Sequence, residues 1–146
     1  MYDNDFYDDL AGALERSWRL LEEAIGDPTS PVRTPVLISV STGGLAQGRT
    51  VVLRGFNRQQ RQLQIYTDVR SAKVAQLRAQ PACTLVAYQP NPMMQLRLST
   101  NAIVNHNNEI THEAWAVMPG PNRCNYLTDP DPGSISVQVT DGRPVI

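Results

Sequence analysis

The sequence has few of the residues from which metal centres and disulfide frameworks are built. Its 146 residues include two cysteines, Cys83 and Cys124, and two histidines, His106 and His112. The cysteines are far apart with no second pair beside either, and the histidines lack the i, i+4 spacing that places two ligands on one helical face. We therefore predict no disulfide framework and no protein-bound metal.

Long apolar runs and aromatic side chains are also scarce. The apolar runs, such as residues 51–53 and 85–87, are far shorter than the roughly 18 residues of a membrane span. The acidic start, residues 1–5, lacks the basic and then apolar order of a secretory signal, so we expect a cytoplasmic protein without membrane contact. Aromatic residues make up only 6% of the chain, which disfavours stacking on nucleobases.

Positive charge is present and is concentrated in the middle of the chain. The net charge is −1, yet residues 49–97 contain eight basic side chains and a single acid, Asp68. Twelve of the thirteen bases are arginine, whose planar guanidinium forms paired hydrogen bonds with phosphate or carboxylate. This pattern indicates an anionic partner.

Apolar periodicity indicates one mainly β domain over residues 1–146. A period of three to four predicts a helix within residues 1–27. A period of two, interrupted by one helical stretch, predicts a barrel core over residues 35–104, and residues 105–146 are expected to hold a short helix, a loop and a candidate last strand. The predicted strands are 36–40, 49–54, 63–67, 83–88, 93–104 and the candidate 135–139; the predicted later helices are 70–80 and 111–118, and residues 119–133 are predicted as loop.

Strands joined by short connections are antiparallel neighbours, and five or six of them favour a small barrel with peripheral helices. Side chains fill the interior of so small a barrel. A ligand of cofactor size is therefore expected outside it, in a cleft or at a subunit interface.

A candidate phosphate site lies where a predicted strand gives way to a helix, over residues 66–73. A helix start presents unpaired N–H groups and the positive end of the helix dipole. Ser71 would add a hydroxyl and Lys73 an ammonium within the first turn, and this combination suits a phosphate. The alternative is that Asp68 or Ser71 caps the helix while Lys73 is solvated.

Two further strands carry polar side chains where apolar ones are usual. Arg49 and Arg54 are five positions apart, so in one strand they point to opposite faces, and one of them approaches the core. An arginine in that position needs an anionic partner. Gln95 and Arg97 share one face of a later strand.

Three segments in this order, Arg49 to Arg54, Tyr66 to Lys73 and Gln95 to Arg97, resemble the FMN-binding split-barrel proteins related to pyridoxamine 5′-phosphate oxidase. The resemblance covers roughly residues 35 to 104. It implies a homodimer with FMN at the subunit interface. Position by position, it implies phosphate contacts from Arg49, Ser71 and Lys73, flavin along the backbone of Thr50, Val51 and Val52, further contacts from Tyr66, Thr67 and Gln95, and a substrate contact from Arg54.

The sequence also departs from the family's pattern. Ala72 stands where the oxidases have an arginine before the motif lysine, and Arg70 is the nearest replacement. The oxidases' substrate segment has no clean match in residues 115–126. Relatives continue into a final strand that closes over the flavin, so either residues 135–139 complete the barrel here or an edge stays open.

Three functions follow as hypotheses. The first is an FMN-dependent oxidoreductase of unknown substrate, in which the flavin performs the redox chemistry and no catalytic residue is identified. The second is a non-catalytic flavin- or haem-binding protein, with His106 or His112 as the only candidate haem ligands. The third, and least favoured, is a barrel that binds single-stranded nucleic acid through the basic segment.

Overall fold

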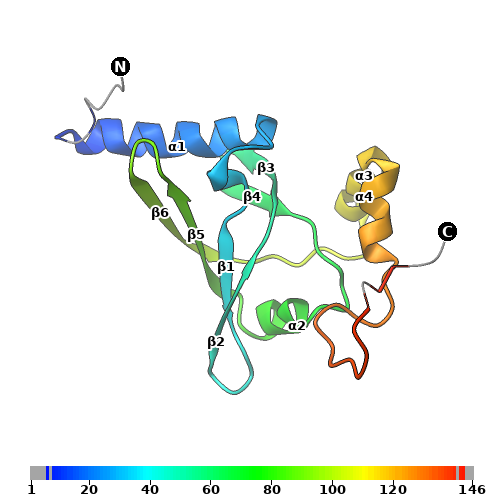
Figure 1. Ribbon diagram of the computed structural model, residues 1–146. Helices are drawn as coiled ribbons and strands as arrows, with labels where there is room; N and C mark the ends of the chain where they lie inside the picture. Colours follow the sequence, from blue (N-terminus) through cyan, green and yellow to red (C-terminus); the bar gives the residue numbers. More distant parts are fainter. Residues whose placement is uncertain (1–5, 7, 141, 144–146) are drawn as a thin grey trace.

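The computed structural model describes residues 6, 8–140 and 142–143, and it is mainly antiparallel β structure with helices at the periphery (Figure 1). This confirms the predicted fold class. The helices are α1 (Leu10–Gly26), α2 (Ala72–Ala79), α3 (Glu109–Val117) and α4 (Gly120–Arg123), with single 3-10 turns at Pro31–Arg33 and Cys124–Tyr126. The strands are β1 (Val36–Val40), β2 (Ala46–Thr50), β3 (Leu53–Asn57), β4 (Gln62–Ile65), β5 (Ala82–Gln89) and β6 (Met94–Asn101).

The strands form two separate sheets, so the barrel is split and does not close. One sheet has the order β2-β1-β5-β6 and the other is the β3–β4 hairpin, with every pairing antiparallel. The predicted strand 49–54 is therefore wrong as a single strand. Its first part pairs with β1, the Val51 N–H donates to the Pro35 carbonyl at 2.9 Å, and the chain then passes to the second sheet at Leu53.

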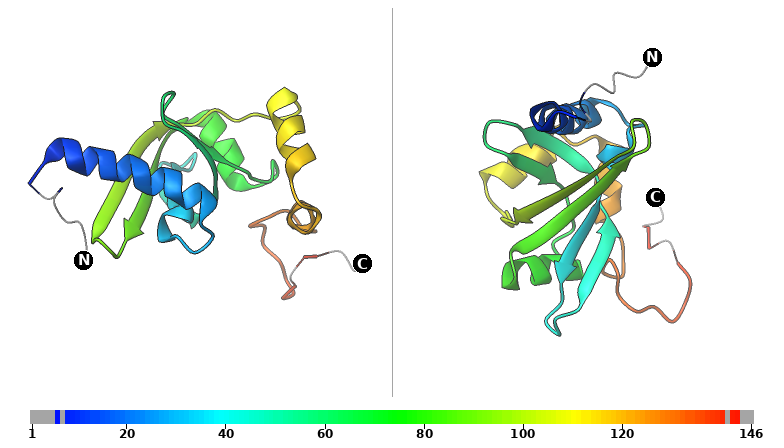
Figure 2. Two further views of the ribbon diagram at one scale, coloured as in Figure 1. Left: turned by 90° about the horizontal axis from the view of Figure 1, so that it is seen from above. Right: turned by 90° about the vertical axis from the view of Figure 1, so that its left-hand side faces the viewer.

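Helix α1 covers one end of the two sheets (Figures 1 and 2). The Asp9 carboxylate caps its start by accepting from two backbone N–H groups at 3.0 Å, a strongly preferred arrangement. Its buried residues join side chains of β3, β5 and β6 in one core cluster: Leu20, Leu21, Ala24, Val32, Leu53, Ala87 and Leu96. Leu10 and Leu14 are two of the apolar residues, spaced by four, that predict this helix, but they are 91% and 55% exposed because the first turns of α1 extend past the sheet.

Helix α2 packs on the other end of the four-stranded sheet and forms a second cluster. Val74 and Leu77 are buried, as the spacing predicts, and Leu77 packs with Leu37, Val51 and Leu85. Pro81 follows the helix, which ends at Ala79. The two clusters leave the start of α2 beside the point where the sheets separate.

The region after β6 differs from the sequence prediction in two places. Helix α3 is confirmed, but α4 and a 3-10 turn occupy part of the predicted loop 119–133. Pro121 suits the first turn of a helix, and the Arg123 guanidinium stabilises the pair by donating to the Trp115 and Ala116 carbonyls.

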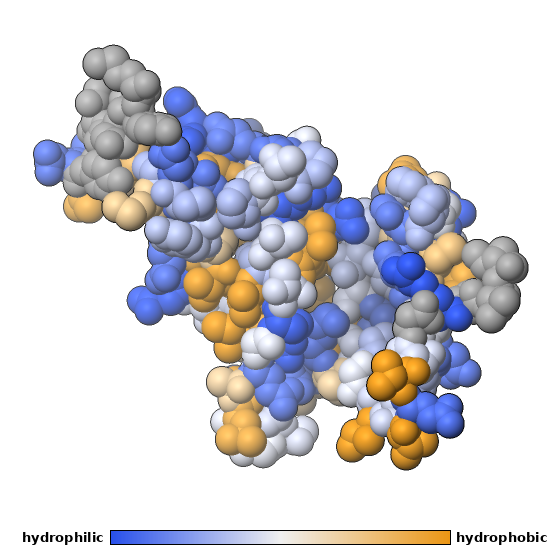
Figure 3. All heavy atoms as spheres, viewed as in Figure 1, coloured by the Kyte–Doolittle hydropathy of each residue, from blue (hydrophilic) through white to orange (hydrophobic). Residues whose placement is uncertain are grey.

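The candidate strand 135–139 does not form. Ile135, Val137 and Val139 are fully exposed there, and Figure 3 shows hydrophobic atoms on the surface of this C-terminal arm. Alternation alone is not sufficient for a strand, because a strand also needs a partner with which to exchange hydrogen bonds. Among the described residues, no helix is long and apolar enough to cross a membrane.

Candidate functional site

Arg49 occupies β2 opposite Leu37 of β1, and its side chain turns to the inner side of the sheet. Its Nη1 donates to the Leu37 carbonyl at 3.2 Å and to Ser39 Oγ at 2.6 Å, and its Nη2 donates to Gln76 Oε1 at 3.2 Å. All three acceptors are uncharged. The sequence argument for an anionic partner is therefore not met by a carboxylate of the described chain, and the guanidinium charge is left without a counter-ion there.

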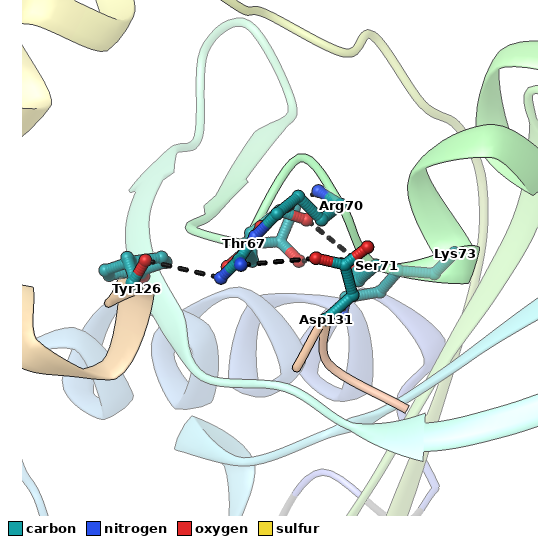
Figure 4. A network of polar contacts seen from close by, with 7 residues as sticks. Thr67, Arg70, Ser71, Lys73, Tyr126 and Asp131 are labelled. Carbon is teal, nitrogen blue, oxygen red and sulfur yellow. Dashed lines mark hydrogen bonds and ion pairs between the residues drawn. The ribbon is translucent and has the colours of Figure 1, made fainter. Parts of the chain in front are cut away.

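A second cation lies at the start of α2, a few residues along from the end of β4. Lys73 Nζ donates to Ser71 Oγ at 3.2 Å, and the Ser71 hydroxyl lies 3.3 Å from Thr67 Oγ1 while it donates to the Asp68 carbonyl at 2.8 Å (Figure 4). Ser71 is the N-cap residue of α2 but makes no side-chain capping hydrogen bond to the helix. The alternative that the Ser71 side chain caps the helix is therefore wrong, whereas the Asp68 carboxylate accepts from the Arg70 N–H at 2.8 Å just before the helix.

The charge of Arg49 acts on Lys73. Burial lowers the pKa of the Lys73 ammonium below its ordinary value, the Arg49 guanidinium lowers it further, and Asp68 acts in the opposite direction. Burial also lowers the pKa of Arg49, which nevertheless stays protonated. Both charges are therefore partly desolvated, and neither is bonded to a carboxylate of the described chain.

Asp68 offsets the charge effect on Lys73 only in part, and its carboxylate is hydrogen-bonded to Arg70. Arg70 Nε and Nη2 donate to the two Asp68 oxygens at 3.0 and 2.7 Å, and Arg70 also pairs with Asp131 at 3.2 Å and reaches the Tyr126 carbonyl (Figure 4). Arg70 thus ties the C-terminal segment to the 66–73 segment. Its charge is balanced by two carboxylates, which argues against the expectation that it replaces the arginine missing at Ala72.

Arg54 and Tyr66 line a separate hollow of about 200 Å³. Arg33 and residues 117–119 and 122 complete its lining. Burial raises the pKa of the neighbouring Tyr126 phenol, and Arg54 partly offsets this rise. Arg49 lies on β2 and Arg54 on β3, and these strands belong to different sheets. The prediction that the two side chains point to opposite faces of one strand therefore does not apply.

The family described as pyridoxamine 5′-phosphate oxidase, FMN-binding domain, matches residues 15–106, which is 92 of the 146 residues. The chain belongs to this family. The match begins within α1 and contains all six strands, α2 and the Arg49–Ser71–Lys73 cluster. The resemblance inferred from three short motifs is thereby confirmed.

One solved structure similar to this chain is a pyridoxamine 5′-phosphate oxidase-related, FMN-binding protein from Nostoc punctiforme PCC 73102. The two share 24% sequence identity with a TM-score of 0.67, and the aligned part covers 88% of this chain and 66% of that one. At this identity the similarity supports the split-barrel fold alone. Among curated proteins, none matches the chain.

The family resemblance also implies contacts from the backbone of residues 50–52 and from Gln95. Thr50 ends β2, directly after Arg49, and Val51 and Val52 form the passage between the two sheets. Gln95 is the second residue of β6, where it pairs with Tyr88 and is exposed to solvent. No hydrogen bond joins it to the cluster in the described chain.

Sequence reasoning did not identify Ser39 and Gln76, which hold Arg49. The available signal in the sequence was a glutamine, Gln76, between the apolar residues Val74 and Leu77 of the predicted helix. His106 and His112 are exposed and line neither of the two hollows found in the described chain.

Proposed function

We propose that this protein binds FMN, with the phosphate held by Arg49, Ser71 and Lys73, and acts as an oxidoreductase whose substrate reaches the bound flavin. The observation that carries the proposal is the convergence of two partly buried cations and a hydroxyl with no carboxylate bonded to either cation in the described chain. This donor set suits a phosphate dianion. Membership of a family whose domain is named for FMN binding selects FMN among phosphate ligands.

The remaining contacts follow from what adjoins the phosphate cluster. The backbone of Thr50 to Val52 runs directly on from Arg49 and would lie along the flavin ring. Thr67, whose hydroxyl lies 3.3 Å from Ser71 Oγ, and the adjacent Tyr66 would make further contacts with FMN. When bound, the flavin supplies the hydride and electron chemistry. The chain's own residues bind and orient it, and Arg54 in the neighbouring hollow would contact an anionic substrate.

A second copy of the chain would cover the outer face of the four-stranded sheet. Strand register places Val36, Ile38, Val86, Tyr88 and Gln95 on this face, and Val36 and Tyr88 are 38% and 51% exposed. A shallow hollow of about 410 Å³ adjoins it, lined in part by Ile38 and Val40. Exposed apolar side chains grouped on a sheet face favour burial against a partner, although the same register also places Arg97 on this face. In such a homodimer Gln95 would lie at the interface, where it would contact FMN bound at the partner's site.

The charge distribution disfavours nucleic acid as the anionic partner. Arg58 pairs with Glu15 and Glu22, and Arg70 pairs with Asp68 and Asp131, so two of the eight basic side chains of residues 49–97 are balanced within the chain. The non-catalytic alternative remains as a flavin-binding protein, since the same cluster would serve it. It would bind FMN without accelerating flavin reduction by any donor.

The proposal is tested by titrating the purified protein with FMN and following the flavin fluorescence. Arg49→Ala and Lys73→Ala each remove a charged hydrogen bond, which contributes about 1.5–3 kcal/mol, or a loss of roughly 10- to 150-fold in affinity. Arg78→Ala is the matched control, because Arg78 is an exposed cation on the same helix. Equal affinity in all four proteins, or no binding by the parent, would contradict the proposal.

A further inference from the structure

Gln76 is a buried amide on the core-facing side of α2. It is 8% exposed and adjoins Leu77, and Val74 on the same helix is buried with it. A buried amide is destabilising unless its hydrogen bonds are made. Here they are made: Oε1 accepts from Ser39 Oγ at 2.6 Å and from Arg49 Nη2 at 3.2 Å, while Nε2 donates to Gln47 Oε1 at 2.6 Å.

The network fixes Arg49 without neutralising it. Ser39 is fully buried, and together with Gln76 and the Leu37 carbonyl it accepts three of the five guanidinium N–H groups. The remaining donors have no hydrogen-bond partner in the described chain. A glutamate in place of Gln76 would be a stronger partner for Arg49, but it would also cancel the charge that an anion requires.

We infer that Gln76, supported by Ser39, is a positioning residue that orients the Arg49 guanidinium through uncharged oxygens and so keeps its full charge for a bound phosphate. This inference deepens the proposed function and rests on it for the identity of the ligand. It assigns a role to side chains that touch Arg49 and not the ligand. It also explains why a polar pair occupies the interior between α2 and β1.

The test compares a substitution that adds a negative charge at position 76 with one that removes the hydrogen-bond acceptor there. Gln76→Glu keeps the shape and pairs with Arg49, whereas Gln76→Met keeps the length but removes the acceptor. Gln59→Glu is the matched control for net charge, because Gln59 is exposed in the β3–β4 turn. Each protein is titrated with FMN and with riboflavin, and its thermal unfolding is measured with and without inorganic phosphate.

We expect Gln76→Glu to bind FMN at least tenfold more weakly than the parent and to lose protection by phosphate, while its affinity for riboflavin changes less than twofold. Gln76→Met should unfold at a lower temperature than Gln76→Glu and yet bind FMN better. A purely structural role predicts the reverse order for FMN. Gln59→Glu should match the parent in every measurement.

The inference is overturned if Gln76→Glu binds FMN within twofold of the parent, or if riboflavin affinity falls in parallel with FMN affinity. If riboflavin does not bind the parent measurably, protection by phosphate decides. A parent that is protected by phosphate but does not bind FMN would refute the cofactor assignment while leaving the role of Gln76 intact. A parent that binds neither would refute both.

Discussion

The pH dependence of flavin binding should report directly on Lys73. Burial and the neighbouring Arg49 hold the pKa of this ammonium below its ordinary value, which is about 10.4. Only the protonated form donates a charged hydrogen bond to phosphate. The affinity for FMN should therefore fall as the pH rises through the lowered pKa, by up to about tenfold per pH unit.

The size of this loss follows from the contact that is removed. One charged hydrogen bond contributes about 1.5–3 kcal/mol, so the affinity should level off roughly 10- to 150-fold below its neutral value. The stability of the ligand-free protein should move in the opposite direction. Because the folded pKa lies below the unfolded one, the unfolded chain binds more protons in this window and the free energy of unfolding rises with pH.

The assay is a fluorescence titration with FMN at closely spaced pH values from 7 upward, on the parent and on Lys73→Arg and Lys73→Ala. Lys73→Arg should keep neutral affinity but lose the alkaline limb, because guanidinium does not titrate in this range. Lys73→Ala should be weak and flat. An identical alkaline limb in all three proteins would assign the titration to the flavin itself and refute the argument.

Four further substitutions test the rest of the structure. Leu21→Ala truncates a side chain that is 1% exposed in the α1 core and should lower the free energy of unfolding by about 2–5 kcal/mol. Leu10→Ala, at 91% exposure, is its control and should change the free energy of unfolding by less than about 0.5 kcal/mol. Chemical denaturation measures both values. Arg70→Ala breaks the contacts to Asp131 and the Tyr126 carbonyl, so limited proteolysis should cut the segment after residue 126 faster, and an unchanged rate would contradict the tether. Arg54→Ala should leave the affinity for FMN unchanged. It should weaken the inhibition of reduced-flavin reoxidation by added anionic carboxylates or phosphates. A parallel loss of FMN affinity would place Arg54 in the cofactor site instead.

Local patterns predicted much of the fold because they are determined by neighbouring residues. The period of α1, the helix start at Ser71 and the turn between β5 and β6 are each specified within a few positions of the chain. The Ser71–Lys73 pair was predicted on the same basis, since both residues belong to one helical turn. Arg49 joined them only through the family resemblance, because its position depends on how β2 and α2 approach each other.

Long-range contacts explain what the sequence did not predict. Residues 49–54 read as one continuous strand, and nothing local marks the passage between sheets at Val51 and Val52; the pairing of Leu53 with Ile65 determines it. Residues 135–139 show the reverse case, with strand periodicity but no strand to pair with. Gln76 was not singled out because its acceptors and donors come from β1 and β2.

The interior between α2 and β1 shows why the phosphate seat should also stabilise the fold. Ser39, Gln76 and Arg49 are hydrogen-bonded to one another between α2 and β1, and the Arg49 charge opposes that of the partly buried Lys73. A ligand that binds only the folded state raises the free energy of unfolding by RT ln(1 + [L]/Kd), about 2.7 kcal/mol at a hundredfold excess over Kd. FMN should therefore raise the unfolding temperature more than riboflavin at equal free concentration, because only FMN carries a phosphate to bind the two cations and so has the lower Kd. Equal protection by the two flavins would mean that the two cations are not where the ligand's negative charge binds.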